Sequence, residues 1–198
     1  MRLAFTARSS LNSVFWPRKT HKVAYTAFML LLGILLLVIS AKISIPFEPV
    51  PMTMQNLAVL FIGMAFGWRL SAVIVLLYLI VGMVGGSVLV GHAGHVNYVN
   101  KALLNGPLAG YLLGMLPAAI VSGYLVEHGW GRSNFGVAAA AMLGMAIMYA
   151  FGLSFLSRMI GWPMAISLGL YPFLFVDMLK VLFLTFLIPL IWKPKQEA

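Results

Sequence analysis

Long apolar runs separated by short polar connectors form the dominant pattern of this chain. A transmembrane helix needs about 20 mostly apolar residues, and six runs reach or approach this length. They cover residues 23–43, 53–67, 70–84, 102–126, 135–157 and 172–192. The second and third runs are short, and only the turn Gly67-Trp68-Arg69 joins them. The pattern predicts an all-α integral membrane protein with six transmembrane helices.

The same runs predict a single membrane domain over residues 1–198, because they leave no length for a separate soluble domain. Within it we expect a basic N-terminal segment at 1–22, a six-helix bundle at 23–192 and a tail at 193–198. The first run is longer than the hydrophobic region of a signal peptide, and no small-residue cleavage site follows it. It is therefore expected to remain as an anchored helix.

The composition supports a membrane protein and excludes several other classes. Hydrophobic residues make up 62% of the chain and charged residues 9%, with a mean hydropathy of +1.01. So few charges exclude a water-soluble globule, and the high hydrophobicity excludes disorder. The chain has no cysteine, which excludes disulfides and thiolate metal sites. It also lacks P-loop, zinc-protease and nucleophile-elbow motifs, so we expect neither an enzyme nor a bound cofactor.

The basic residues predict how the helices are oriented. The formal net charge is +9, which in a soluble protein would suggest nucleic acid. Here the basic residues lie mostly in the two terminal segments and the connectors, so membrane orientation explains them better, and no nucleic-acid partner is expected. The side without the termini would carry only Lys42, Lys101 and Arg158. Because the more basic side of a membrane protein faces the cytoplasm, both termini are predicted on the cytoplasmic side of the cell membrane. The other side would carry Arg2, Arg8, Arg18, Lys19, Lys22, Arg69, Arg132, Lys193 and Lys195.

The predicted outer connectors, at 44–52, 85–101 and 158–171, have unusual compositions. The first has three prolines between 46 and 51, which favour extended backbone or simply end a helix. The second is rich in glycine and is expected to dip toward the membrane, where irregular backbone is stable only inside protein or beside a cavity. Its His92 and His95 lack a third ligand with metal-site spacing, so no metal is expected. We therefore expect a ligand to enter from the outer half.

Two charged residues interrupt the last apolar run. Asp177 is the only acid inside any run, and Lys180 follows it three residues later, which places both on one helical face. Charges at this depth are costly and are usually functional, although a structural ion pair is the alternative. Because Pro172 suits a first helical turn, the pair is expected in the outer part of the helix.

Two further polar residues have two interpretations each. Gln55 opens the second run, where its side chain could bond a ligand or cap the helix. Tyr111 lies near the outer end of the fourth run, where it could face a cavity or belong to the interfacial aromatic belt.

Several motifs together resemble the BioY biotin transporter family, in the family's order. The stretch from Ile45-Pro46 through Val50-Pro51-Met52-Thr53-Met54-Gln55-Asn56-Leu57 resembles its I-P-x-x-P-V-P-x-T-x-Q-x-L signature. Later segments are similar to its G-P-T-G-G-Y-L, Y-x-x-G and P-F-x-x-x-D-x-x-K elements. These segments are Gly106-Pro107-Leu108-Ala109-Gly110-Tyr111-Leu112, Tyr149-Ala150-Phe151-Gly152 and Pro172-Phe173-Leu174-Phe175-Val176-Asp177-Met178-Leu179-Lys180.

The resemblance implies a six-helix substrate-binding (S) component of an energy-coupling factor (ECF) vitamin transporter. Such a protein binds biotin from outside, within the lipid bilayer. It works with a coupling membrane protein and two ATPase subunits, and some members are thought to work alone. A carboxylate such as Asp177 can accept a ureido N–H of biotin, and Lys180 can donate to the ureido carbonyl or to the tail carboxylate. Tyr111, Gln55 and Asn97 are the further candidate binding residues. The helix faces that carry glycine could pack within one chain or between chains, so a homo-oligomer is compatible with the sequence.

The chain departs from the family pattern at three places. The glycine-rich outer loop reads Gly91-His92-Ala93-Gly94-His95-Val96-Asn97, and Asn97 is the candidate for its polar, ligand-contacting residue. Leu108 and Ala109 replace a usual threonine and glycine. Ala24 is followed four residues later by Phe28 rather than by the alanine of the family's docking face. The alternative function is a proton-coupled secondary transporter of another small vitamin or organic acid, with Asp177 carrying the proton.

Overall fold

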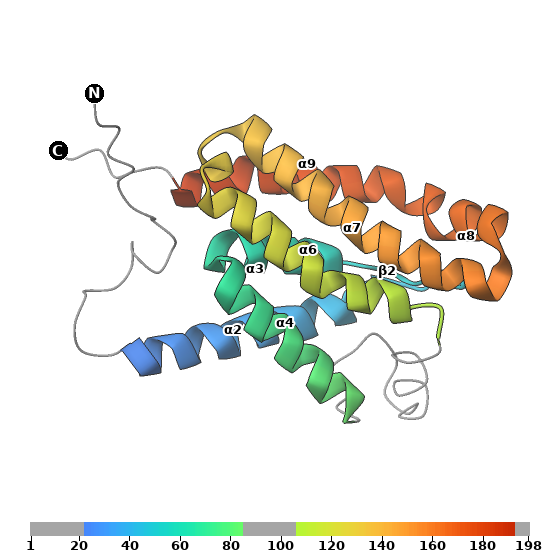
Figure 1. Ribbon diagram of the computed structural model, residues 1–198, viewed down its shortest axis with the longest axis horizontal. Coiled ribbons are helices and arrows are strands. Elements are labelled where there is room, and N and C mark those ends of the chain that lie inside the picture. The colour runs from blue at the N-terminus through green and yellow to red at the C-terminus, as the bar shows by residue number, and fades with distance from the viewer. Residues whose placement is uncertain (1–21, 85–105, 193–198) are drawn as a thin grey trace.

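Helices make up most of the chain that the structure describes. The computed structural model describes residues 22–84 and 106–192 (Figure 1). Its elements are α2 (Lys22–Lys42), β1 (Ser44–Ile45), β2 (Met52–Thr53), α3 (Gln55–Phe66), α4 (Trp68–Met83), α6 (Ala109–Glu127), η1 (Trp130–Arg132), α7 (Asn134–Ile160), α8 (Trp162–Gly169) and α9 (Tyr171–Trp192). Because the strands within these ranges have only two residues each, the predicted all-helical class is confirmed.

The helices correspond closely to the apolar runs of the sequence. Within the described ranges, four helices (α2, α6, α7 and α9) are long and apolar enough to cross a membrane. The shorter helices α3 and α4 are equally apolar but have 12 and 16 residues. A single residue, Gly67, joins these two helices, and its φ of 86° is a conformation that glycine adopts without strain.

The bundle has two different ends, which lie at opposite sides of Figure 1. At one end β1 and β2 pair antiparallel, with Ser44 opposite Thr53 and Ile45 opposite Met52. This end also carries α8, and we call it the hairpin end. At the other end lie η1, the Gly67 turn, the start of α2 and the finish of α9, and we call it the η1 end. The proline-rich stretch predicted as an extended connector is the loop of the hairpin.

The third predicted connector, 158–171, is largely helical. In it α7 continues to Ile160, and α8 occupies Trp162–Gly169. Gly161, with a φ of 81°, ends α7, and Pro163 then stands in the first turn of α8. A proline in a first turn has no N–H to lose, so Pro163 suits the start of α8.

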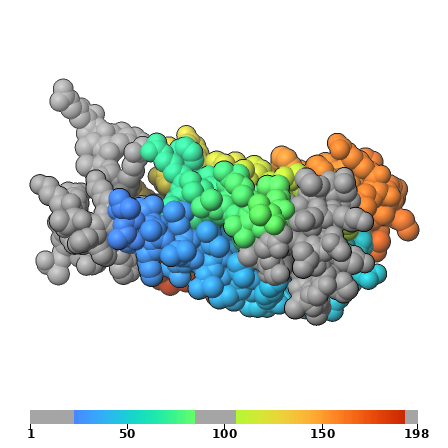
Figure 2. All heavy atoms as spheres, turned by 90° about the horizontal axis from the view of Figure 1, so that it is seen from below, coloured from blue at the N-terminus to red at the C-terminus, as the bar shows by residue number. Residues whose placement is uncertain are grey.

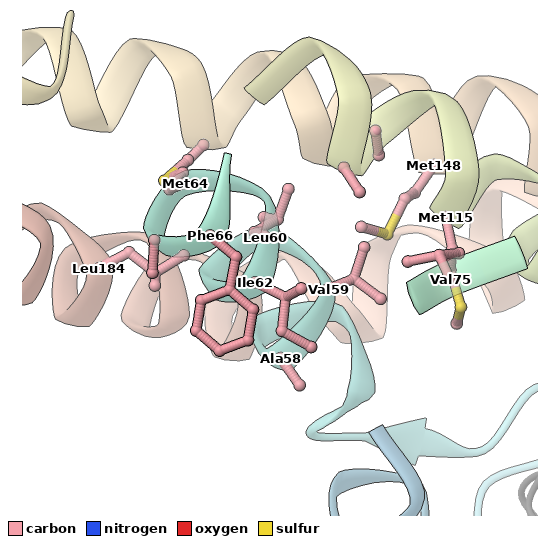
Figure 3. Close-up of a cluster of buried hydrophobic side chains, with 14 of the residues drawn as sticks. Ala58, Val59, Leu60, Ile62, Met64, Phe66, Val75, Met115, Met148 and Leu184 are labelled. Atoms are coloured by element: carbon pink, nitrogen blue, oxygen red, sulfur yellow. The ribbon is translucent and has the colours of Figure 1, made fainter. Parts of the chain in front are cut away.

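The main core forms where α3, α4, α6, α7 and α9 meet. Val59 of α3, Met115 of α6 and Met148 of α7 gather at one place in it (Figure 3). Toward the η1 end, α3 and α6 approach closely because Gly63 and Gly123 have no side chains. A Cβ on Gly63 would lie 2.6 Å from the carbonyl oxygen of Ala119, which is closer than real contacts allow.

Helix α2 packs more loosely than the others. Figure 2 shows it in blue beside α4 in green on one face of the molecule. Large apolar side chains of α2, among them Phe28, Leu31 and Leu35, are exposed along it. Such a surface is compatible with lipid and not with water.

Candidate substrate-binding site

A buried ion pair lies in the first half of α9, toward the hairpin end. Lys180 Nζ lies 2.7 Å from Asp177 Oδ1, one helical turn away. Asp177 is 3% exposed and Lys180 is 4% exposed. The spacing of three therefore does place both residues on one helical face, as the sequence predicts.

Two other elements hold this pair. Lys180 Nζ also donates a hydrogen bond of 2.7 Å to the backbone carbonyl of Thr53 in β2. Tyr149, in the middle of α7, donates its hydroxyl hydrogen to the other carboxylate oxygen of Asp177. The sequence reasoning did not select Tyr149 as a site residue. Its signal was the Tyr-x-x-Gly motif, where a polar ring end stands in an otherwise apolar run.

The cluster keeps unused hydrogen-bonding capacity. An ammonium group has three hydrogens, and Lys180 uses two of them on described residues, toward Asp177 and Thr53. Each oxygen of Asp177 accepts one hydrogen bond from the described chain, and a carboxylate oxygen has room for a second. The hydroxyl oxygen of Tyr149 can also accept. One donor and several acceptors therefore lie within a few ångströms, and the formal charges of the ion pair cancel.

Tyr111 of α6 lies next to this cluster and anchors α8. Its hydroxyl donates a 2.8 Å hydrogen bond to the carbonyl of Gly169. Its ring meets that of Tyr149 edge to face, with centroids 6.3 Å apart. Gly152 lies against the same ring, where a Cβ would collide with it. Because Tyr111 is 8% exposed, the interpretation as a residue of the interfacial belt is wrong.

Apolar side chains from four elements pack with Tyr111, and Tyr149 packs against them. A second buried cluster joins Val50 of the hairpin, Leu156 of α7, Ala165 of α8 and Phe173 of α9 to Tyr111. The hairpin also packs on α9 through Phe47, whose ring lies edge-on to that of Phe173, with centroids 6.1 Å apart. The hairpin end therefore combines a few placed polar groups with aromatic and aliphatic walls, which is the usual make-up of a small-molecule site.

The side chain of Gln55 is buried and contacts residues of α4 and α6. It is 1% exposed, and its Nε2 donates to the hydroxyl of Tyr78 in α4 at 2.9 Å and contacts Met115 Sδ at 3.6 Å. The start of α3 has no side-chain cap at Met54, and the backbone N–H of Gln55 itself donates to Thr53 Oγ1. The interpretation of Gln55 as a helix cap is therefore wrong. A contact between Gln55 and a ligand stays a prediction.

The remaining candidates lie outside the described residues. Asn97, His92 and His95 fall between positions 84 and 106, so the structure does not place them. In the described part of the chain, no group of three or more histidine, aspartate or glutamate residues could hold a metal ion.

The chain is similar to known proteins. A family model described as the BioY family matches residues 11–197. The biotin transporter BioY of Rhizobium etli is 33% identical over 144 residues, which cover 69% of this chain and 72% of that protein. The biotin transporter BioY of Thermotoga maritima is 32% identical over 148 residues, which cover 74% of this chain and 83% of that protein.

The fold also has a solved counterpart. The crystal structure of an S component for biotin from an ECF-type transporter superimposes with a TM-score of 0.69 at 24% identity. The match covers 95% of this chain and 96% of that one. The predicted S-component-like helical membrane fold is therefore confirmed.

Proposed function

Because the chain belongs to the BioY family, we propose that it binds biotin and carries it across the cytoplasmic membrane as the S component of an ECF-type transporter. It is a multi-pass membrane protein of a transporter family, and not an enzyme. The observation that carries the proposal within this chain is the buried cluster of Asp177, Lys180 and Tyr149.

The unused groups of the cluster complement the head of biotin. The ureido ring has two N–H donors and one carbonyl acceptor. Asp177 and the hydroxyl oxygen of Tyr149 accept hydrogen bonds, and the third hydrogen of Lys180 donates one. Because the ion pair is neutral overall, it receives a neutral ring without adding net charge to a buried site.

The other candidate residues have supporting roles in this proposal. The ring of Tyr111 and the apolar cluster around Phe173 form the wall for the sulfur-containing ring and the aliphatic tail. Asn97 supplies a polar contact from the outer loop. Gln55, at the start of α3, is a candidate for a further contact with the ligand. Lys180 alternatively meets the tail carboxylate, so the binding experiment below includes a biotin amide.

We further propose that the 23–192 bundle crosses the membrane six times, with the 1–22 segment and the 193–198 tail in the cytoplasm. The four long helices and the two shorter apolar helices support six crossings. The excess of basic residues in the sequence of the 1–22 segment and the 193–198 tail, together with Arg69 and Arg132, supports the orientation. The hairpin end then faces outward, where biotin enters.

Partners follow from the same proposal. We expect the chain to dock on a coupling membrane protein with two ATPase subunits, or to work without them, as a single chain or as a homo-oligomer. The pair Ala24 and Phe28 of α2 replaces the two alanines of the family's docking face. Biotin uptake that survives a protonophore and stops on ATP depletion supports the ATPase-driven form. The reverse result supports a proton-coupled secondary transporter.

The direct test is equilibrium binding of labelled biotin to the purified full chain in detergent. Thiamine, riboflavin and biotin amide serve as competitors. We expect saturable binding that unlabelled biotin abolishes and that thiamine and riboflavin leave unchanged. Displacement by the amide as strong as that by biotin would place Lys180 at the ureido ring rather than at the tail. A folded chain that binds no biotin would overturn the proposed substrate.

A further inference from the structure

The pair Gln55 and Tyr78 lies beside the proposed site without belonging to its contacts. Tyr78 is fully buried in α4, and its hydroxyl accepts the 2.9 Å hydrogen bond from Gln55 Nε2. The second hydrogen of the same amide nitrogen faces Met115 Sδ at 3.6 Å. Both donors of the Gln55 amide are therefore directed into the core of the bundle.

This hydrogen bond fixes the first residue of α3, and α3 begins directly after the hairpin. Gln55 stands two residues after Thr53, and its backbone N–H donates to Thr53 Oγ1 at 3.3 Å. Thr53 in turn pairs with Ser44 in the hairpin. The position of Thr53 therefore depends on both the hairpin and the anchored start of α3.

Thr53 is where this anchor meets the ion pair. Its backbone carbonyl accepts the 2.7 Å hydrogen bond from Lys180 Nζ. A hydrogen bond of this kind weakens steeply when distance or angle changes. A shift of the α3 start would therefore release Lys180 from one of its two described partners and change where its remaining hydrogen points.

We infer that Gln55 and Tyr78 are positioning residues for substrate binding, which act on Lys180 through the Thr53 carbonyl. The inference rests on the proposed function and assigns Gln55 a role different from ligand contact. Tyr78, on a helix that contributes no described residue to the site cluster, becomes a determinant of biotin affinity.

The test is a double-mutant cycle between Tyr78→Phe and Lys180→Met, read by equilibrium biotin binding to the full chain. Phenylalanine keeps the ring and removes only the hydroxyl. Losing a neutral hydrogen bond corresponds to about a three- to tenfold change, and we expect this loss of affinity when Lys180 is present. With Lys180→Met, Tyr78→Phe should change the affinity less than twofold. An equal loss in both backgrounds, or none in the first, would overturn the inference.

Two further variants separate positioning from general stability. Gln55→Met removes the other half of the same hydrogen bond and should give the same loss, with no further loss in combination with Tyr78→Phe. Ser122→Ala is the matched control, because it removes a buried hydroxyl that bonds to Ala118 within its own helix. It should leave the affinity unchanged. Equal losses from Ser122→Ala and Tyr78→Phe would count against the inference.

A cycle without biotin covers the case in which Lys180→Met binds too weakly to measure. The melting temperatures of the four proteins in detergent report the coupling between Tyr78 and Lys180 directly. Non-additive shifts support the inference, and additive shifts overturn it. Failure of the wild-type chain to bind biotin would overturn the proposed function and leave this second cycle interpretable.

Discussion

Buried polar side chains toward the η1 end bond to their own helix, whereas several at the hairpin end also bond to other elements. Toward the η1 end, the hydroxyls of Ser71, Ser122 and Thr185 each donate to a backbone carbonyl three or four residues earlier. At the hairpin end, Ser40 bonds within α2, but four other polar side chains join different elements. Lys180 reaches β2, Tyr149 reaches α9, Tyr111 reaches α8 and Gln55 reaches α4.

The two ends also differ in how their helices pack. Toward the η1 end, small residues such as Gly63 and Gly123 let helix backbones touch, which holds helices together without polar side chains. At the hairpin end, aromatic rings and an ion pair fill the space between helices. The difference teaches that the η1 end relies on close helix contacts, whereas the hairpin end gathers polar groups from several elements, where we propose the substrate site. Five substitutions at four places, from the largest expected effect to the smallest, test this separation.

The largest effect is expected at the ion pair. Asp177→Asn and Lys180→Ala each remove a hydrogen bond to a charged group, which is worth about 1.5–3 kcal/mol. Biotin affinity should therefore fall roughly 10- to 150-fold, measured by equilibrium binding to the purified variants. Thermal unfolding of the same samples serves as the control for folding. Wild-type affinity in both variants would remove the ion pair from the site.

The next effect is expected in stability rather than in affinity. Gly63→Ala places a methyl group against the Ala119 carbonyl, and overpacking of this kind costs about 1–3 kcal/mol. The melting temperature in detergent should fall, while the folded fraction binds biotin within about twofold of wild type. A large loss of affinity from this distant position would contradict the separation between the two ends.

A smaller effect is expected for Tyr111→Phe. The substitution keeps the ring against Gly152 and removes the hydrogen bond to the Gly169 carbonyl. A neutral hydrogen bond contributes about 0.5–1.5 kcal/mol, so biotin should bind about two- to tenfold more weakly. Titration with labelled biotin measures this. An unchanged affinity would show that the contact between α6 and α8 has no role in the site.

The smallest effect is expected for Thr185→Val. Its hydroxyl bonds to Val181 within α9, the helix that also carries the ion pair. Removing it should change the affinity less than about twofold and the stability by less than about 1 kcal/mol. Parallel binding and unfolding measurements check both values. A loss comparable to that of Lys180→Ala would mean that the polar site extends along α9 toward the η1 end.

The sequence predicts the long helices well because each is a long apolar run with polar flanks. For α9, the predicted range of 172–192 differs from Tyr171–Trp192 by one residue. Helix α8 and the hairpin were missed for a physical reason. Eight residues and two-residue strands are too short for a periodicity to show, and their stability comes from contacts such as that of Tyr111 with Gly169.

The site could be predicted only where its geometry is local. Asp177 and Lys180 are three residues apart, so helix geometry alone brings them together. Tyr149 meets Asp177 across 28 positions, and Gln55 meets Tyr78 across 23. Such pairs depend on how helices pack, and one sequence contains no direct record of that. A tyrosine within an apolar run also counts as apolar, which hides its hydroxyl.

The shortness of α3 and α4 has a consequence for the surrounding bilayer. With 12 and 16 residues at about 1.5 Å each, they extend about 18 and 24 Å, against a hydrocarbon core of about 30 Å. In the proposed six-crossing arrangement, hydrophobic mismatch is therefore largest at these two helices, and each ångström of it costs a fraction of a kcal/mol. A thicker bilayer would strain them first, and α3 begins only two residues after Thr53. Membrane thickness would thereby act on the proposed biotin site.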